Sequence, residues 1–431
     1  MNKQVFAALK TESMPGPHDI TRTELGNGIV LLVRPNYSSL SVAISGFLQA
    51  GSLYDPEPKL GLADYTATTL MRGTANRSFS EIYDELESMG ASLGVSPGAH
   101  TAGFGGKSLA DDLPHLLALL ADVLIHPVFP KSDVEKVRSQ LLTGLELRAQ
   151  DTGEMASMGF DQIAYAGHPY RYPSDGYLDT IQAIKQKDLV DFHAKHYGPM
   201  EMVIVITGAV KSETAQKLVE ESLGSWTNPD QPEVFQVPEA APLGETTRVH
   251  HPIEEKSQSD IVLGVVGPRR KWAGFYPALL GNSILGQFGM MGRIGDSVRN
   301  QAGLAYYAYS SLSSSIGPGP WIVAAGVAPQ NLEKAIGLIK TEIKKFIAEP
   351  VTTQELADVQ SNYIGRLPLS LESNSGVASA LLTMERHQLG LDYLQGYEKM
   401  IREVTADSIL DASRQYLDPD RLAISTAGPP L

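Results

Sequence analysis

Residues 41–46 read SVAISG, and residues 259–264 read SDIVLG. Two more pairs of segments match in the same order: VRSQLLTGL at 137–145 with VQSNYIGRL at 359–367, and the Asp-Tyr-Gly series at 188, 197 and 208 with that at 407, 416 and 428. The offset is about 220 positions in every case, and ordered matches at one spacing are the signature of a repeat. The sequence therefore predicts one domain present twice.

The repeat divides the chain into two domains and a linker. A chain of 431 residues is too long for a single hydrophobic core. Between the repeats, SWTNPDQPEVFQVPEAAPLGETT at 225–247 is rich in Pro and lacks helical or strand periodicity, which is typical of an extended linker. We therefore predict an N-terminal domain at 1–224 and a C-terminal domain at 248–431.

Each half begins with β-patterned segments and continues with helical ones. The leucines at 113, 116, 117, 120 and 124 follow the three-four spacing of an amphipathic helix. The order of segments predicts an α+β fold with two tandem homologous domains, each a mainly antiparallel β-sheet with helices packed on one face. The expected strands are 28–34, 41–49, 202–207, 261–266, 321–327 and 421–426, and the expected helices are 113–124, 132–149, 332–348 and 353–367.

Composition limits the possible functions. A net charge of −14 argues against nucleic-acid binding, which needs a basic face, and favours long-range attraction of basic peptides. The absence of Cys excludes thiol nucleophiles, disulfides and Cys-type zinc sites. No apolar run approaches the roughly 20 residues that span a bilayer. The compartment stays open: periplasmic if a signal peptide has been removed, and cytoplasmic otherwise.

Two motifs are weak candidates for chemistry. HTAGFGGKSL at 100–109 resembles a phosphate-binding loop, but Thr101 stands where that loop requires Gly, and the glycines lie in a β-patterned region. His193 and His196 are one helical turn apart and could hold a metal, yet the second repeat has no His at the matching positions. A structural role explains both segments.

A sequence frame at residues 51–74 carries a family resemblance. The chain reads GSLYDP at 51–56, GLA at 61–63 and RGT at 72–74. This resembles the frame around the metal-binding helix of the pitrilysin/insulinase-like zinc peptidases, and together with the duplication the resemblance extends over nearly the whole chain. In active members the helix carries H-x-x-E-H, two zinc-binding imidazoles with a water-activating Glu between them.

The resemblance implies that the zinc site is lost. Asp64 and Thr68 stand at the two His positions, and Ala67 stands at the Glu position. The third ligand of the family, a Glu on a later helix, falls near Gly144 or Leu145, and the neighbouring Glu146 alone cannot make the site. We expect no metal or other cofactor in this chain and a structural role for the helix.

The second half contains the family's complementing residues. Members carry R-x-x-x-G-L-[AG]-Y before an apolar strand, and here the stretch 299–306 reads RNQAGLAY. In active members the Arg and the Tyr reach across a chamber to the zinc site and hold the peptide backbone and the developing oxyanion. By position these are Arg299 and Tyr306. We expect the neighbouring Tyr307 to point to the opposite face of its strand.

The combination resembles the zinc-free chain of the family's bacterial two-subunit members, which are similar to mitochondrial processing peptidase. We expect a heterodimer with a homologous subunit that bears H-x-x-E-H and the zinc, acting on peptides. The Gly-containing stretch 286–295, with Gly289 and Gly292, is a candidate for substrate contact, or alternatively a turn between helices. There are two alternatives. The chain is a scaffold like the core subunits of the respiratory cytochrome bc complex, or it forms a homodimeric peptide-binding chamber without catalysis.

Overall fold

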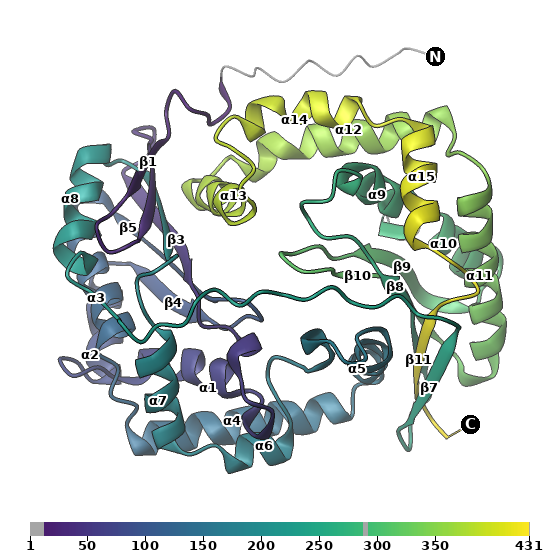
Figure 1. Cartoon of the computed structure of the whole chain (residues 1–431), viewed down its shortest axis with the longest axis horizontal. Helices are drawn as coiled ribbons and strands as arrows, with labels where there is room; N and C mark the ends of the chain where they lie inside the picture. Colours follow the sequence, from purple (N-terminus) through teal and green to yellow (C-terminus); the bar gives the residue numbers. More distant parts are fainter. Residues whose placement is uncertain (1–12, 288–291, 431) are drawn as a thin grey trace.

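The computed structural model describes residues 13–287 and 292–430 and contains two similar lobes, each built on one β-sheet (Figure 1). The first sheet has the strand order β1-β2-β6-β3-β5-β4, and the second has the order β7-β11-β8-β10-β9. The first consists of β1 (Thr21–Glu24), β2 (Val30–Pro35), β3 (Ser41–Leu48), β4 (Ser92–Ser96), β5 (Ala102–Leu109) and β6 (Val203–Gly208). The second consists of β7 (Thr247–Pro252), β8 (Ser259–Val266), β9 (Ala305–Leu312), β10 (Pro320–Val327) and β11 (Ala423–Gly428).

Neighbouring strands are antiparallel except for β2 with β6 and β7 with β11, which are parallel. The expected α+β class is therefore confirmed, with sheets that are mixed and mainly antiparallel. Each expected strand and helix overlaps an observed one, and the glycines of 100–109 lie in β5, as the β-patterned interpretation requires.

The helices of the first half are α1 (Leu62–Thr69), α2 (Phe79–Ser88), α3 (Leu113–Ile125), α4 (Lys131–Ala149), α5 (Thr152–Ala164), α6 (Leu178–Ala183), α7 (Gln186–His196) and α8 (Ser212–Leu223). Those of the second half are α9 (Phe275–Asn282), α10 (Arg293–Gly295), α11 (Leu332–Ala348), α12 (Thr353–Ser370), α13 (Asn374–His387), α14 (Tyr393–Arg402) and α15 (Ala406–Tyr416). Two π-helical segments, η7 (Ser283–Gln287) and η9 (Asp296–Gln301), flank α10.

The repeat is visible in the placement of the elements. Strands β3 and β5 of the first half correspond to β8 and β10 at the same offset of about 218 positions, whereas α7 and β6 correspond to α15 and β11 at about 220. With the offset of 220, Tyr416 at the end of α15 corresponds to His196 at the end of α7. The sequence match paired Tyr416 with Tyr197, one position further on.

The two halves exchange one helix each. Helix α5 precedes the linker but packs against β7, β8 and β11 of the second sheet, whereas α13 follows the linker but packs against β3 and β6 of the first. Figure 1 shows α13 beside β3, and α5 beneath the second sheet. The expectation of helices on one face therefore holds only for each half's own helices, because the opposite face is covered by the partner half.

Alternating strand residues confirm that each sheet is buried on both faces. In β6, Ile204 and Ile206 belong to the core formed with the first half's own helices, whereas Val203 and Val205 belong to a core that contains α13. In β11, Ile424 faces the second half's own helices, whereas Ala423 packs with α5. Burial on both faces explains why these strands are almost continuously apolar.

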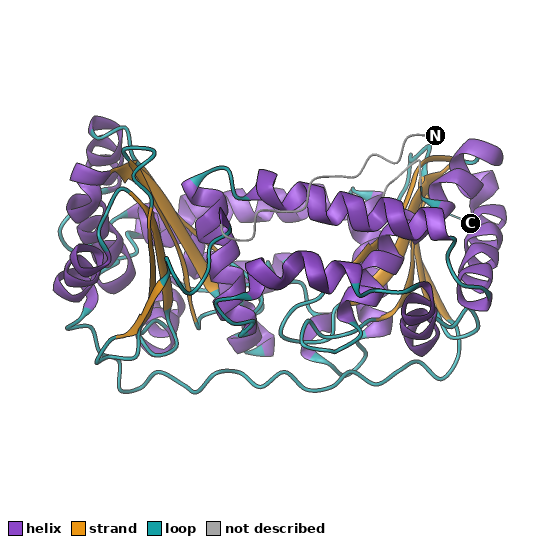
Figure 2. Cartoon of the chain, turned by 90° about the horizontal axis from the view of Figure 1, so that it is seen from above, coloured by secondary structure: helices purple, strands orange, loops and turns teal. Residues whose placement is uncertain are grey.

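The chain between α8 and β7 has no helix or strand and crosses from one lobe to the other (Figure 2). Near its middle it is attached to both lobes: the backbone N–H of Phe235 donates to the Tyr54 hydroxyl of the first at 2.9 Å, and Arg269 of the second donates to the carbonyls of Val237 and Pro238. Within 13–287 and 292–430, no helix is both long enough and apolar enough to cross a membrane.

Candidate functional site

Helix α1 is positioned by a backbone turn and a buried carboxylate. Gly61 precedes the helix with a φ of 91°, which favours Gly. Asp55 accepts hydrogen bonds from the backbone N–H groups of Gly61 and Ala63, each at 2.8 Å, and so caps the helix start. Burial raises the pKa of Asp55 to about 7 in spite of these bonds. The frame identified in the sequence therefore folds as a rigid turn that opens a helix.

The face of α1 where the family holds zinc carries other chemistry. The Thr68 hydroxyl donates to Asp64 at 3.5 Å, so the two positions lie one turn apart on one face, and Ala67 is buried. Burial raises the pKa of Asp64 to about 6, and the negative charge of Asp175 adds to the effect. On the facing helix α4, Leu145 is buried and Glu146 is exposed.

These residues do not fit a zinc ion. Zinc in proteins takes imidazole, thiolate and carboxylate ligands, and this face offers one carboxylate, one hydroxyl and apolar side chains. Within the part of the chain that the structure describes, no group of three or more His, Cys, Asp or Glu is arranged to hold a metal.

His193 and His196 are packing residues of α7. The Nε2 atom of His193 is 2.9 Å from the carbonyl oxygen of Leu124, and its ring stacks on Tyr197. The ring of His196 lies 4.4 Å from that of Phe192. Burial lowers the pKa of both imidazoles to about 4, so both are neutral near pH 7. These contacts favour the structural interpretation of the pair.

Arg299 and Tyr306 lie next to each other at the start of the edge strand β9. Arg299 is in the π-helical segment η9, an irregularity that often marks functional sites. The chain then turns at Gly303, whose φ is 64°, and enters β9. The guanidinium carbon of Arg299 is 6.0 Å from the centre of the Tyr306 ring, and that ring is 79% exposed. The structure thus brings together the pair expected from the sequence.

A β-bulge places Tyr306. Opposite β10, Gly326 pairs with Tyr307 and Val327 pairs with Ala305, so Tyr306 is an extra residue in β9. Bulges redirect side chains and are common next to active sites. Simple alternation, on which the expectation for Tyr307 was based, is interrupted here. The two tyrosines differ in their surroundings instead: Tyr306 is 79% exposed, and Tyr307 is half-buried.

Tyr307 is held by a buried network that the sequence did not reveal. Its hydroxyl donates to Asp260 at 2.5 Å, and Asp260 also accepts from Gln258 and from Thr152, the first residue of the exchanged helix α5. A side chain at Gly326 would collide with the Tyr307 ring, because its Cβ would lie 2.6 Å away. The bulge in β9 is therefore held in place partly by Thr152, which belongs to the first half of the chain. A polar Asp inside the apolar run SDIVLGVV is the one signal that could have indicated this network.

The Gly-containing stretch 286–295 lies only partly within the described residues. Gly289 lies outside the described residues. Gly292 is described and buried, and its Cβ position would be 2.6 Å from the Cα of Gly286. Close backbone packing accounts for Gly at 292, and contact with substrate remains a prediction for both residues.

Two cavities lie in the described structure near these elements. The first, of about 830 Å³, is bordered by α1's entry loop, α5, residues 167–175 and the β9–β10 hairpin, and so lies between the two halves. Its acidic residues include Asp161 on α5, whose pKa burial raises to about 7. A carboxylate of that kind is half-protonated near neutral pH, so this wall is less negative than its composition suggests.

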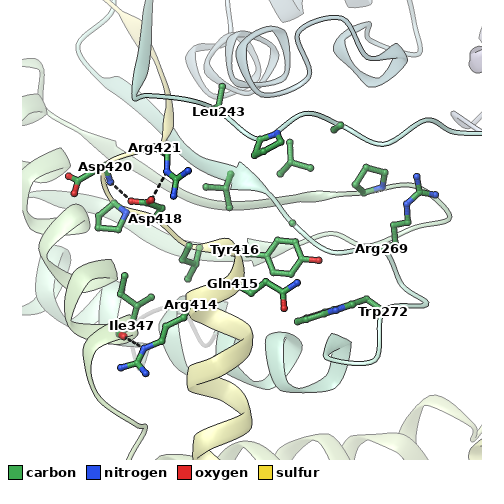
Figure 3. A pocket seen from close by; sticks show the side chains of 18 of the residues that line it. Leu243, Arg269, Trp272, Ile347, Arg414, Gln415, Tyr416, Asp418, Asp420 and Arg421 are labelled. Atoms are coloured by element: carbon green, nitrogen blue, oxygen red, sulfur yellow. Dashed lines mark hydrogen bonds and ion pairs between the residues drawn. The ribbon is translucent and has the colours of Figure 1, made fainter.

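The second cavity, of about 940 Å³, belongs to the second half and the linker (Figure 3). Trp272 and Tyr416 line it, and their rings lie 5.0 Å apart. The corresponding residues of the first half, Tyr54 and His196, have ring centres 4.9 Å apart, and there Phe235 of the linker packs on Tyr54. Phe235 of the linker therefore packs beside the aromatic pair of the first half, whereas the space beside the corresponding pair of the second half is a cavity.

Comparison with known proteins gives consistent matches over both halves. The family model described as "Insulinase (Peptidase family M16)" matches residues 31–173, and the model described as "Peptidase M16 inactive domain" matches residues 183–363. An uncharacterized zinc protease of Mycobacterium leprae is 24% identical over 420 residues, which cover 95% of this chain and 92% of the relative. One of Bacillus subtilis is 23% identical over 387 residues, 90% of this chain and 92% of the relative.

Solved structures show the same fold. The crystal structure of a peptidase M16 inactive domain from Pseudomonas fluorescens superposes with a TM-score of 0.88 at 25% identity and covers 96% of this chain and 98% of that one. A protease from Helicobacter pylori gives 0.87 at 19% identity, covering 96% and 100%. A chain of Complex III2 from Candida albicans gives 0.78 at 16% identity, covering 95% of each chain.

Proposed function

Because the chain belongs to the insulinase family of peptidases, M16, we propose that it is the zinc-free subunit of a two-subunit metallopeptidase. In this proposal a homologous subunit bearing H-x-x-E-H supplies the zinc, and Arg299 and Tyr306 of this chain complete the site. The family relationship rests on two models that together match both halves. The division of labour is our inference from the residues of this chain.

The observation that carries the proposal is the state of Arg299 and Tyr306. Both side chains are available to another molecule: the Tyr306 ring is 79% exposed, and none of the described residues forms an ion pair or a side-chain hydrogen bond with Arg299. An exposed aromatic ring contributes little to folding, whereas an Arg and a phenol side by side can bind a carbonyl and an oxyanion.

In the assembled enzyme each residue would have a separate task. The Arg299 guanidinium would donate charge-assisted hydrogen bonds to a substrate carbonyl and so orient the peptide. The Tyr306 hydroxyl would donate to the oxygen that becomes negative in the tetrahedral intermediate, a bond made mainly in the transition state. The partner's zinc would polarise the carbonyl and activate water. This chain's own α1 would hold the wall of the chamber.

The decisive experiment replaces Tyr306 with Phe in a complex of this chain and the homologous zinc-bearing subunit. Phe keeps the ring and its contact with Arg299 and removes only the hydroxyl. Loss of one oxyanion donor typically lowers kcat by about 10²–10³-fold. We expect a complex of unchanged assembly and melting temperature whose kcat for a fluorogenic peptide falls by that factor, with a small change in KM.

Tyr309→Phe is the matched control, since Tyr309 is on the same strand, is 41% exposed and has a hydroxyl without a hydrogen-bond partner among the described residues. Its complex should cleave like the wild type. If Tyr306→Phe also cleaves like the wild type, the pair is not part of the site, and the chain serves as a scaffold for its partner.

A further inference from the structure

The second cavity, of about 940 Å³, contains an aromatic pair whose polar atoms are unused (Figure 3). Trp272 and Tyr416 both line it, both are partly buried, and their ring planes are inclined by 74°. Buried Trp and Tyr side chains usually have a hydrogen-bond partner for their polar atom. Among the described residues, however, neither the indole N–H of Trp272 nor the hydroxyl of Tyr416 has one, and neither atom is fully enclosed. Both groups are therefore accessible to a ligand in the cavity.

The first half shows what the corresponding position binds. Tyr54, which corresponds to Trp272, contacts the linker where it crosses as an extended chain (Figure 2). Its hydroxyl donates to the carbonyl of Glu233 at 3.3 Å and accepts from the backbone N–H of Phe235 at 2.9 Å. The Phe235 ring is inclined by 82° to the Tyr54 ring, and the ring centres are 5.9 Å apart. One aromatic side chain on an extended backbone thus completes the aromatic pair of the first half.

The linker does not make the same contact in the second half. Its remaining part, residues 236–247, contains no aromatic residue. Leu243 borders the cavity, but it packs with the core that contains α5, whereas Trp272 and Tyr416 pack with the core of the second half's own helices. In Figure 3 the side chain of Leu243 points away from the aromatic pair. The linker therefore passes the cavity without completing the pair.

Positive charge predominates around the cavity. Its lining includes eight charged residues, which are Arg269, Lys271, Lys344, Arg414, Arg421, Glu239, Asp418 and Asp420. Arg269 pairs with Glu239 at 2.9 Å, and Arg421 pairs with Asp418 at 2.6 Å. Within the described structure the remaining three cations form no ion pair, and one carboxylate, that of Asp420, remains beside them. In a chain with a net charge of −14, this local excess favours a negatively charged occupant.

We propose that the second cavity binds an extended, acidic segment of another polypeptide through one aromatic side chain, as the first half binds Phe235 of the linker. The aromatic ring packs on Trp272 and Tyr416, and the indole N–H and the hydroxyl form hydrogen bonds with the backbone of the segment. An acidic residue next to the aromatic one is attracted by Lys344 and its neighbours. The cavity has the size of a typical ligand site, about 300–1,000 Å³. This inference goes beyond the proposed function and does not depend on it.

The test measures the binding of a synthetic segment to the isolated full-length chain by calorimetry near pH 7. The probe is the acetylated hexapeptide amide Ser-Glu-Val-Phe-Gln-Ser, which carries the linker residues 233–236 between two Ser. We expect the form with Ala in place of Phe to bind at least about tenfold more weakly, because the ring supplies most of the apolar area that is buried. The form with Gln in place of Glu should bind a few-fold more weakly at about 50 mM salt, and this difference should vanish at about 500 mM, where charges are screened.

Variants of the chain locate the bound segment. Trp272→Ala should abolish binding, and Trp272→Phe should keep part of it, because Phe keeps a ring but has no N–H. Tyr37→Ala removes a ring that is 62% exposed and lies outside the cavity, so this control should bind like the wild type. Lys344→Gln should reduce the advantage of Glu over Gln in the probe. Its matched control is Lys334→Gln, on the same helix α11 but outside the cavity, which should keep the full advantage.

Three results would overturn the proposal. These are absence of binding to the wild-type chain at about 1 mM peptide, equal binding of the Phe and Ala forms, and undiminished binding to Trp272→Ala, which would place the peptide elsewhere. If Trp272→Ala has a lowered melting temperature, the decision rests on the two peptide forms and on Lys344→Gln, which changes an exposed side chain. No zinc subunit is present in this test, so its outcome is independent of the experiment on Tyr306.

Discussion

The exchanged helices predict that the two halves unfold as one unit. Multi-domain chains commonly unfold in separate steps. Here α5 is joined in sequence to the first half and buries Phe160 against the second sheet, together with Ala324 and Ala423. Neither sheet can keep both faces covered if the other half unfolds.

Phe160→Ala measures this coupling. Phe160 is 1% exposed, and replacing a buried Phe by Ala removes its contacts and leaves a cavity, at a cost of about 3–5 kcal/mol. That loss is a large part of the stability of a typical protein, about 5–15 kcal/mol. Because α5 connects the halves, we expect the whole loss to be felt by both of them.

The assay is guanidinium unfolding followed by the fluorescence of a single Trp in each half. Trp226 belongs to the core of the first half and Trp321 to that of the second, and the chain's third tryptophan is Trp272. Two variants that retain only Trp226 or only Trp321, with Trp272 replaced in both, therefore report the halves separately. Both should give the same midpoint, and Phe160→Ala should lower both equally. Phe192→Ala, in the first core, should also shift both. Midpoints that separate by more than the error, with only the Trp321 signal responding to Phe160→Ala, would refute the coupling.

Two further predictions concern the degenerate helix and the cavity. After exposure to zinc and dialysis, elemental analysis should find well below one zinc per chain. The triple variant Asp64→His, Ala67→Glu and Thr68→His should still not bind zinc tightly, because α4 has Leu145 where the third ligand would be needed. One bound zinc per wild-type chain that is lost in Asp64→Ala would contradict this prediction. Burial raises the pKa of Asp161 to about 7, so between about pH 4 and pH 7 the folded chain keeps a proton on Asp161 that the unfolded chain has released. The contribution of Asp161 to the free energy of unfolding therefore declines as the pH rises from about 4 to about 7. As the pH rises over that window, the melting temperature of Asp161→Asn should fall less than that of the exposed control Asp111→Asn. Parallel curves of melting temperature against pH for the two variants would contradict the prediction.

The sequence predicted what depends on local pattern. The three-four leucine spacing correctly indicated the helix that begins at Leu113, and the repeat indicated two homologous sheets. We expected helices on one face of each sheet only. The apolar runs of β6 and β11 agree with burial on both faces, but a pattern does not say which helix covers a face, so the exchange of α5 and α13 was missed. The bulge at Tyr306 was also invisible, because it results from the count of residues opposite β10 and not from the type of any residue in β9.

The packing explains how a chain of this family can lack the zinc ligands and still fold. On α1 the buried positions do the structural work: the Tyr65 hydroxyl donates to the Val134 carbonyl at 2.6 Å, and the Thr66 and Thr69 hydroxyls donate to carbonyls one turn earlier. Among the described residues, the only side-chain hydrogen bond of Asp64 and Thr68 joins them to each other, so we expect other residues there to cost the fold little. Packing explains the buried residues of α1, but it does not explain Arg299 and Tyr306. No packing within the described structure requires an exposed Tyr beside an unpaired Arg, which is why we propose that the pair serves a molecule that binds there.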